Sequence, residues 1–183
     1  MTRKALSTLP SFDRESGDAF TVVETPKGSH NKYAFNEELE AFELRKVLPR
    51  GMGFPYNFGF IPSTRADDGD PLDILLLMDA SAPSGCVVRT RVIGAIEAEE
   101  SEDGKKWVRN SRLIGVATHA HHANADSLKD LNPEVLDEIE GFFEQYNRLE
   151  GKQFRPIDRV GPKRAMLLIT EAQASSTKGK KAG

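Results

Sequence analysis

The chain has 183 residues, a length that suits one domain with a substantial hydrophobic core. Hydrophobic residues make up 38% of it and charged residues 29%, as in ordinary globular proteins, and the net charge of −3 argues against a nucleic-acid partner. The first ten residues contain no apolar stretch of the kind that export signals carry, so we expect neither export nor a membrane partner. The single cysteine, Cys86, cannot form an internal disulfide, which indicates a reducing compartment and therefore a cytoplasmic location.

The sequence predicts an N-terminal arm followed by six strands. Residues 1–18 are polar and aperiodic, which predicts a flexible N-terminal arm. Alternating or continuous apolar runs predict strands at 20–24, 31–35, 41–48, 74–78, 87–96 and 112–116. Between the third and fourth of these, residues 51–62 are rich in glycine and aromatic side chains. We expect strands to bend around a barrel corner there, with glycines where backbones approach closely.

A hairpin is predicted around Asp103-Gly104, which is a strong signal for a two-residue turn. Equal pairing about that turn sets Glu97 opposite Asn110. If the hairpin carries a bulge, Glu100 takes the place of Glu97, and the sequence leaves this register open.

Two amphipathic helices are predicted towards the C-terminus. Asn132 suits the N-cap of the first helix and Pro133 its first turn, and the second helix follows Gly161. Residues 174–183 are small, polar and basic, which predicts a disordered tail. Residues 19–173 are therefore expected to form a single domain in which many strands precede two helices, an α+β arrangement.

The strongest functional signal is a cluster of carboxylates. Asp68, Asp70 and Asp73 lie within six residues, and Asp73 leads into the apolar run 74–78, which reads as a buried strand. Asp is depleted in strands, and unpaired buried carboxylates are strongly destabilising, so we expect a cation among them. Hard oxygens at this spacing suit Mg²⁺ or Mn²⁺. A plain acidic turn is the alternative, whereas an EF-hand is excluded because Leu72 stands where that loop requires glycine.

A second possible metal site is formed by His119, His121 and His122. These residues lack the i, i+4 spacing of a helical site and lie in a polar segment. A solvated loop is the favoured interpretation.

The stretch Asp68-Gly69-Asp70-Pro71-Leu72-Asp73 resembles the D-x-D-P-x-D signature of the soluble (family I) inorganic pyrophosphatases. The similarity extends over most of the chain. It implies an OB-like five-stranded closed β-barrel with an extended hairpin and two C-terminal helices, and assembly into a homo-oligomer. It also implies an activity, the Mg²⁺-dependent hydrolysis of inorganic pyrophosphate to two phosphates by in-line attack of a metal-bound water.

The resemblance assigns roles to individual residues. Asp68, Asp70 and Asp73 are expected to bind metal, and Asp70 also to deprotonate the attacking water. Glu24 matches an acidic position that serves a further metal, although an exposed strand glutamate is an equal alternative. The phosphate-binding positions correspond to Lys32, Arg45, Arg112 and Tyr146. For Tyr146, core packing on the helix is the rival interpretation.

Several positions depart from the family pattern. Asn110 stands where a ligand Asp is expected, and its neutral oxygen predicts weaker metal binding. Glu97, or Glu100 in the bulged register, is expected to supply the other hairpin acid. The remaining departures are Ala34 for Glu, Phe58 for Tyr and Asn147 for Lys. Together they predict a divergent branch with fewer contacts to metal and phosphate.

Two other functions are compatible with these departures. One is hydrolysis of a different small phosphoanhydride. The other is a non-catalytic anion-binding or assembly module on an inherited barrel. Turnover of pyrophosphate separates all three functions.

Overall fold

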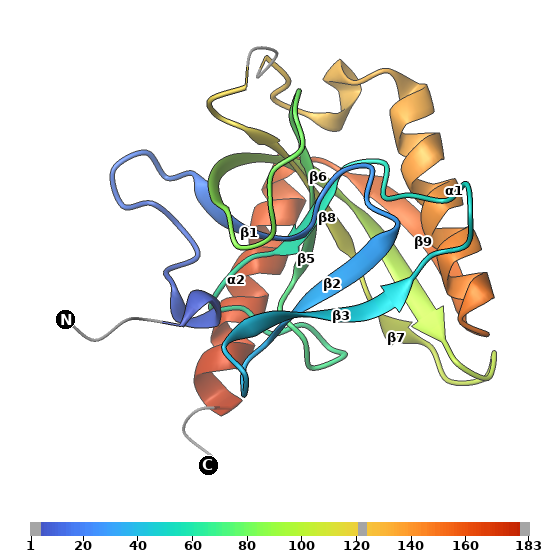
Figure 1. Ribbon diagram of the computed structural model, residues 1–183. Coiled ribbons are helices and arrows are strands. Elements are labelled where there is room, and N and C mark those ends of the chain that lie inside the picture. Colours follow the sequence, from blue (N-terminus) through green and yellow to red (C-terminus); the bar gives the residue numbers. More distant parts are fainter. Residues whose placement is uncertain (1–4, 121–123, 180–183) are drawn as a thin grey trace.

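The computed structural model describes residues 5–120 and 124–179 (Figure 1). The strands in these ranges are β1 (Ala19–Thr25), β2 (Asn31–Asn36), β3 (Ala41–Val47), β4 (Asn57–Phe60), β5 (Asp73–Leu77), β6 (Val87–Ser101), β7 (Val108–Arg109), β8 (Arg112–Ala117) and β9 (Gln153–Val160). The helices are α1 (Pro133–Leu149) and α2 (Pro162–Gly179), with short 3₁₀ turns at Leu6–Thr8 and Leu128–Asp130.

Five strands close into a ring. They pair in the order β1-β4-β5-β8-β6, and β6 pairs in turn with β1. The pairings are antiparallel except for that of β5 with β8. The predicted α+β fold, an OB-like five-stranded barrel with two C-terminal helices, is therefore confirmed.

Gly59 in β4 marks a close approach of two barrel strands. A Cβ atom placed there would lie 2.0 Å from the carbonyl oxygen of Val22 in β1. No larger residue fits without moving a strand, so the expectation of glycine at a close backbone approach is confirmed here.

Two further parts of the sheet structure lie outside the ring. β2 and β3 form a separate two-stranded sheet, which crosses in front of the barrel in Figure 1. β9 pairs with β6 and is not among the strands that the sequence predicts. Pro156 lies within β9, where a shift in pairing register accommodates it. The two C-terminal helices are therefore separated by a strand rather than adjacent.

The hairpin of β6 and β7 adopts a register one residue away from equal pairing about its turn. Glu99 pairs with Arg109, and the backbone N–H of Asn110 donates to the carbonyl of Ala98 at 2.9 Å. Because the side-chain period of a strand is two, this shift moves Glu97 to the face opposite Asn110. The predicted pairing of Glu97 with Asn110 is therefore wrong.

The two helices cover different parts of the barrel core. Ile139 and Phe143 of α1 are buried with Phe54 and Phe58. In α2 the buried face is formed by Ala165, Ile169 and Ala172. On both helices the buried apolar side chains recur with the helical period, as the predicted amphipathic character requires.

Asn132 caps α1, and its side-chain oxygen accepts the backbone N–H of Glu134 at 3.2 Å. Replacing Asn132 with Ala is expected to lower the free energy of unfolding by about 1 kcal/mol, because a helix N–H loses its partner. Urea unfolding measures the change. Asn132→Asp keeps an acceptor and should match the parent, and an alanine variant as stable as the parent would contradict the cap.

Parts of the predicted N-terminal arm and C-terminal tail have defined contacts or secondary structure. The hydroxyl of Ser11, which is buried, donates to the carbonyl of Pro62 at 2.6 Å, so the segment 5–18 is tied to the barrel. Helix α2 continues to Gly179, through part of the segment 174–183 that is predicted to be disordered. Residues 1–4 and 180–183 lie outside the described residues.

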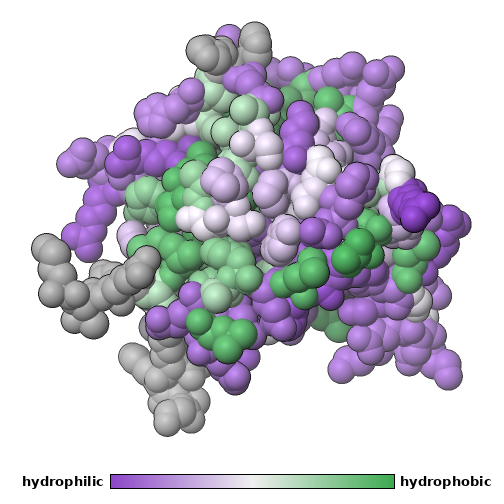
Figure 2. Space-filling model, viewed as in Figure 1, coloured by the Kyte–Doolittle hydropathy of each residue, from purple (hydrophilic) through white to green (hydrophobic). Residues whose placement is uncertain are grey.

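The polarity of the visible surface differs from one part of the fold to another. Figure 2 shows hydrophilic residues over α1 and the β6–β7 hairpin, with hydrophobic residues gathered near β1 and α2. Among the described residues, no helix combines the length and apolar character that a membrane span needs.

Candidate active site

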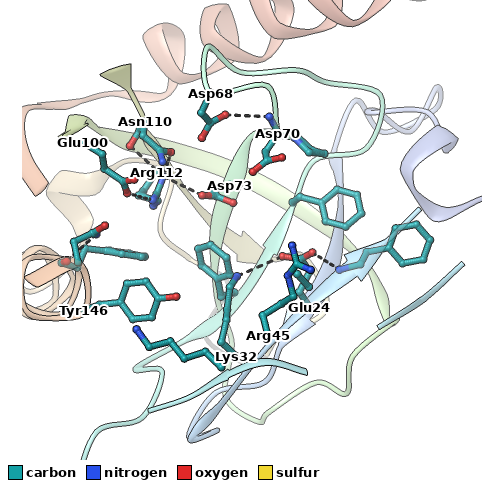
Figure 3. A pocket seen from close by; sticks show the side chains of 18 of the residues that line it. Glu24, Lys32, Arg45, Asp68, Asp70, Asp73, Glu100, Asn110, Arg112 and Tyr146 are labelled. Atoms are coloured by element: carbon teal, nitrogen blue, oxygen red, sulfur yellow. Dashed lines mark hydrogen bonds and ion pairs between the residues drawn. The ribbon is translucent and has the colours of Figure 1, made fainter. Parts of the chain in front are cut away.

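A cavity of about 560 Å³ lies between the barrel, the β2–β3 sheet and α1. The predicted site residues that line it are Glu24, Lys32, Arg45, Asp68, Asp70, Asp73, Asn110, Arg112 and Tyr146. Figure 3 shows the three aspartates on one side and Lys32, Arg45 and Tyr146 on the other. Acidic and basic side chains from distant segments of the chain therefore face one space.

The loop before β5 presents the aspartates. Gly69 has φ +96°, which permits the tight bend, and Asp68 Oδ1 accepts the backbone N–H of Asp70 at 3.1 Å. Desolvation in the cavity raises the pKa of Asp68 to about 6. Desolvation also raises the pKa of Asp73, against the opposing charges of Arg112 and Lys32. The protein alone thus leaves negative charge here incompletely compensated.

Arg112, the first residue of β8, joins two of the acids. Its Nη1 lies 2.9 Å from Asp73 Oδ2 and its Nη2 lies 2.7 Å from Glu100 Oε1. Nη1 also donates to the backbone and side-chain carbonyls of Asn110. The guanidinium carbon lies 4.9 Å from the ring centroid of Phe143. These contacts fix a planar cation between the β5 and β6 sides of the cavity.

Lys32 and Glu24 form a second fixed pair. Lys32 Nζ lies 3.7 Å from Glu24 Oε2, and Glu24 Oε1 accepts the backbone N–H of Phe35 at 2.7 Å. The ammonium also lies 3.9 Å from the ring centroid of Phe58. Burial raises the pKa of Glu24 and lowers that of Lys32. Glu24 is therefore a buried, paired carboxylate rather than an exposed strand residue.

Arg45 and Tyr146 complete the side opposite the aspartates. Arg45 is largely exposed, and its Nη1 lies 2.9 Å from Glu43 Oε2. Burial raises the pKa of Tyr146 well above its usual value, so the hydroxyl keeps its proton and can donate. The Tyr146 ring also packs against Phe54 at 6.0 Å between centroids. Its two predicted roles, core packing and a place in the cavity, are thus compatible.

The carboxylates suit a divalent cation by their chemistry. Asp68, Asp70 and Asp73 offer hard oxygens, and the raised pKa values of Asp68 and Asp73 mark the charge that a cation would relieve. Within the described residues, no three His, Cys, Asp or Glu side chains converge into a ready-made cage. This arrangement fits Mg²⁺, which usually keeps several waters and binds one or two carboxylates together with substrate phosphates.

Of the two hairpin acids considered, Glu100 lines the cavity and Glu97 does not. Glu97 Oε1 lies 2.8 Å from Arg164 Nε in α2, and its Oε2 lies 3.7 Å from Arg109 Nη1. The prediction that Glu97 is a metal ligand is therefore wrong, and the hairpin register explains why.

The departures from the family pattern have clear structural settings. The side-chain oxygen of Asn110 accepts from Arg112, and Phe58 packs against the Lys32 ammonium. Asn147 is 2% exposed and donates to the carbonyl of Phe143 in its own helix at 3.0 Å. Ala34 lines the cavity without a polar group. At these four positions the cavity therefore has fewer charged and hydroxyl groups than the family pattern expects.

Two further residues with charged side chains line the cavity and were not predicted from the sequence. Lys46 and Glu150 line the cavity although no sequence motif marks them. A basic pair at 45–46 is the only available signal, and strict strand alternation places its members on opposite faces.

His119, of the second possible metal site, lies on an exposed turn, and His121 and His122 are outside the described residues.

The fold and cavity define a class of protein: a five-stranded barrel with a cavity in which an acid cluster faces basic side chains. The family model for inorganic pyrophosphatase matches residues 21–177. The inorganic pyrophosphatase of Nostoc sp. is 39% identical over 148 residues, which cover 80% of this chain and 84% of that protein. The inorganic pyrophosphatase of Thermus thermophilus is 37% identical over 172 residues, covering 92% and 94%.

A solved structure of inorganic pyrophosphatase from Thermus thermophilus superposes with a TM-score of 0.86 at 33% identity, covering 95% of this chain and 99% of that one. The chain therefore belongs to the inorganic pyrophosphatase family. Membership implies a divalent metal cofactor, in agreement with the oxygen-rich cavity.

Proposed function

We propose that this protein hydrolyses inorganic pyrophosphate to two phosphates with Mg²⁺ as its cofactor, Mn²⁺ being a possible substitute. The observation that carries the proposal is the division of one cavity into an aspartate side and a basic side. Pyrophosphate carries several negative charges, so it needs cations on every side. The relatives named above support the choice of pyrophosphate.

The basic side of the cavity binds and orients the substrate in this proposal. Lys32, Arg45 and Arg112 contact phosphoryl oxygens, and the protonated hydroxyl of Tyr146 donates to another. The Nη1 and Nη2 groups of Arg112 are held by Asp73 and Glu100, and one N–H of Nη2 is left to donate to a phosphoryl oxygen. Because Asp73 and Glu100 fix its guanidinium, little rearrangement is needed on binding.

The aspartate side supports the chemical step. Asp68, Asp70 and Asp73 would hold the cation, and Glu24 and Asn110 line the same cavity and would offer further oxygens. When bound, Mg²⁺ neutralises phosphoryl oxygens and acidifies a coordinated water. Asp70 accepts a proton from the attacking water. The new P–O bond forms as the bridging P–O bond breaks, and the proton passes to a product phosphate.

Two further properties are part of the proposal. A cytoplasmic location is supported by the single cysteine, and a homo-oligomer is supported by the family resemblance. The absence of a charged or hydroxyl group at Ala34, Phe58 and Asn147 also favours a divergent member of the family with weaker metal or phosphate binding.

Phosphate release from pyrophosphate tests the function directly. We expect release in millimolar Mg²⁺ to exceed release in EDTA by at least about 100-fold, because the cation neutralises the transition state. Tripolyphosphate and ATP, assayed alongside, should be poorer substrates. Equal release in EDTA, or preference for one of those other phosphoanhydrides, would contradict the proposal.

A further inference from the structure

The pairing of β2 with β3 carries a bulge at Arg45. Lys32 pairs with Lys46 and Tyr33 pairs with Leu44, so Arg45 is an extra residue in the ladder. In a regular strand, Lys46 would share the face of Leu44, which is 51% exposed. The bulge instead gives Lys46 the face of Lys32. Consecutive basic residues, Arg45 and Lys46, therefore both line the cavity.

Lys46 extends from β3 to the α1 side of the cavity. Its Nζ lies 2.9 Å from Glu150 Oε1, just beyond the end of α1, and 5.0 Å from the ring centroid of Tyr146. Only 26% of its side chain is exposed. A cation is thus held beside Tyr146 by a carboxylate that is itself accessible from the cavity.

Like charges directly opposite on paired strands are destabilising, and Lys32 and Lys46 are such a pair. Each has its own carboxylate, Glu24 for Lys32 and Glu150 for Lys46. An anion bound between the two ammonium groups would relieve the repulsion. Both lysines lie on one face of the hairpin and line the cavity. This arrangement favours a role for Lys46 in binding an anion over a role limited to its ion pair with Glu150.

The position after Tyr146 strengthens this interpretation. Asn147 occupies it; its amide is neutral, and its nitrogen donates to the Phe143 carbonyl within the helix. We propose that Lys46 is a phosphate-binding residue of this site, which supplies from β3 the ammonium that α1 lacks beside Tyr146. Glu150 is its partner when no phosphate is bound. The inference rests on the proposed function and names a further residue that recognises the substrate.

Binding of methylenediphosphonate, a diphosphate that cannot be hydrolysed, tests the proposal in the presence of Mg²⁺. Lys46→Met is expected to weaken its affinity, and to raise KM for pyrophosphate, by roughly 10-fold or more, the effect of losing a charged hydrogen bond. Lys46→Arg should restore most of the loss. Glu150→Gln should strengthen binding by releasing Lys46, and should do so less in the Lys46→Met background.

Lys27→Met is the matched control. Lys27 also lies over a tyrosine ring, at 5.6 Å from the centroid of Tyr56, but outside the cavity. It should leave affinity, KM and melting temperature unchanged. If Lys46→Met and Glu150→Gln weaken binding to the same extent, the pair is structural and the proposal is overturned.

The same measurements separate this inference from the proposed activity. An active parent with a Lys46→Met variant of unchanged affinity and KM overturns the role of Lys46 alone. A parent that binds the diphosphonate without hydrolysing pyrophosphate overturns the activity, and weaker binding by Lys46→Met then still supports the role of Lys46. A parent that neither binds nor hydrolyses overturns both.

Discussion

An Asp70→Asn variant is expected to lose pyrophosphate turnover by about 100- to 10,000-fold, the range typical of a lost general base. The amide keeps the size of the side chain but cannot accept a proton from water. Asp70 is exposed at the aspartate side of the cavity and contributes no core packing, so the fold should survive. Its backbone N–H, which donates to Asp68, is also retained.

Steady-state phosphate release and a thermal melt together test this expectation. Asp67→Asn is the matched control, because Asp67 is an exposed neighbour that does not line the cavity. The control should keep both turnover and melting temperature. Turnover by Asp70→Asn at the rate of the parent would show that another group accepts the proton.

Replacing Arg112 with Met is expected to lower the free energy of unfolding in EDTA by about 3–5 kcal/mol, the usual cost of leaving buried charges without their partner. The Arg112 side chain is 6% exposed, and its guanidinium neutralises both Asp73 and Glu100. Methionine fills the apolar space beside Phe143 but leaves the two carboxylates facing each other.

Urea unfolding with and without Mg²⁺ measures this effect. Mg²⁺ should restore part of the lost stability in Arg112→Met, since a divalent ion can take the place of the missing charge. Arg109→Met, on the same hairpin, is the control. Arg109 is 48% exposed and lies 3.5 Å or more from its acidic partners, so the change should cost less than about 1 kcal/mol. Equal losses in the two variants would contradict the bridging role.

Local patterns predicted the elements of the fold well, because each depends on neighbouring residues. The run after Asp73 is a buried strand, and the cap at Asn132 begins a helix. Five strands close into the expected ring. β9 was missed because Pro156 interrupts its pattern and because its partner, β6, is distant in sequence.

Site residues were predictable where they belong to one contiguous motif. They were less predictable where the pairing register of two strands decides which side chains face the cavity. Asp68, Asp70 and Asp73 follow one another and enter the cavity together. Glu100 and Lys46 depend on single-residue offsets, one in the turn before β7 and one at the Arg45 bulge. A shift of one residue exchanges the two faces of a strand, and no local propensity fixes it.

The closure of the barrel has a consequence for biosynthesis. Ala19 in β1 pairs with Thr90 in β6, and Ala95 of the same β6 pairs with Val160 in β9. One edge of β1 can pair with β4 early, but its other edge stays unpaired until β6 has been synthesised, and β6 pairs with β9 only after residues 153–160 have been made. Such delayed pairing slows folding and leaves early strands exposed to aggregation. Nascent chains stalled before residue 87 should consequently depend on chaperones, whereas released chains should not.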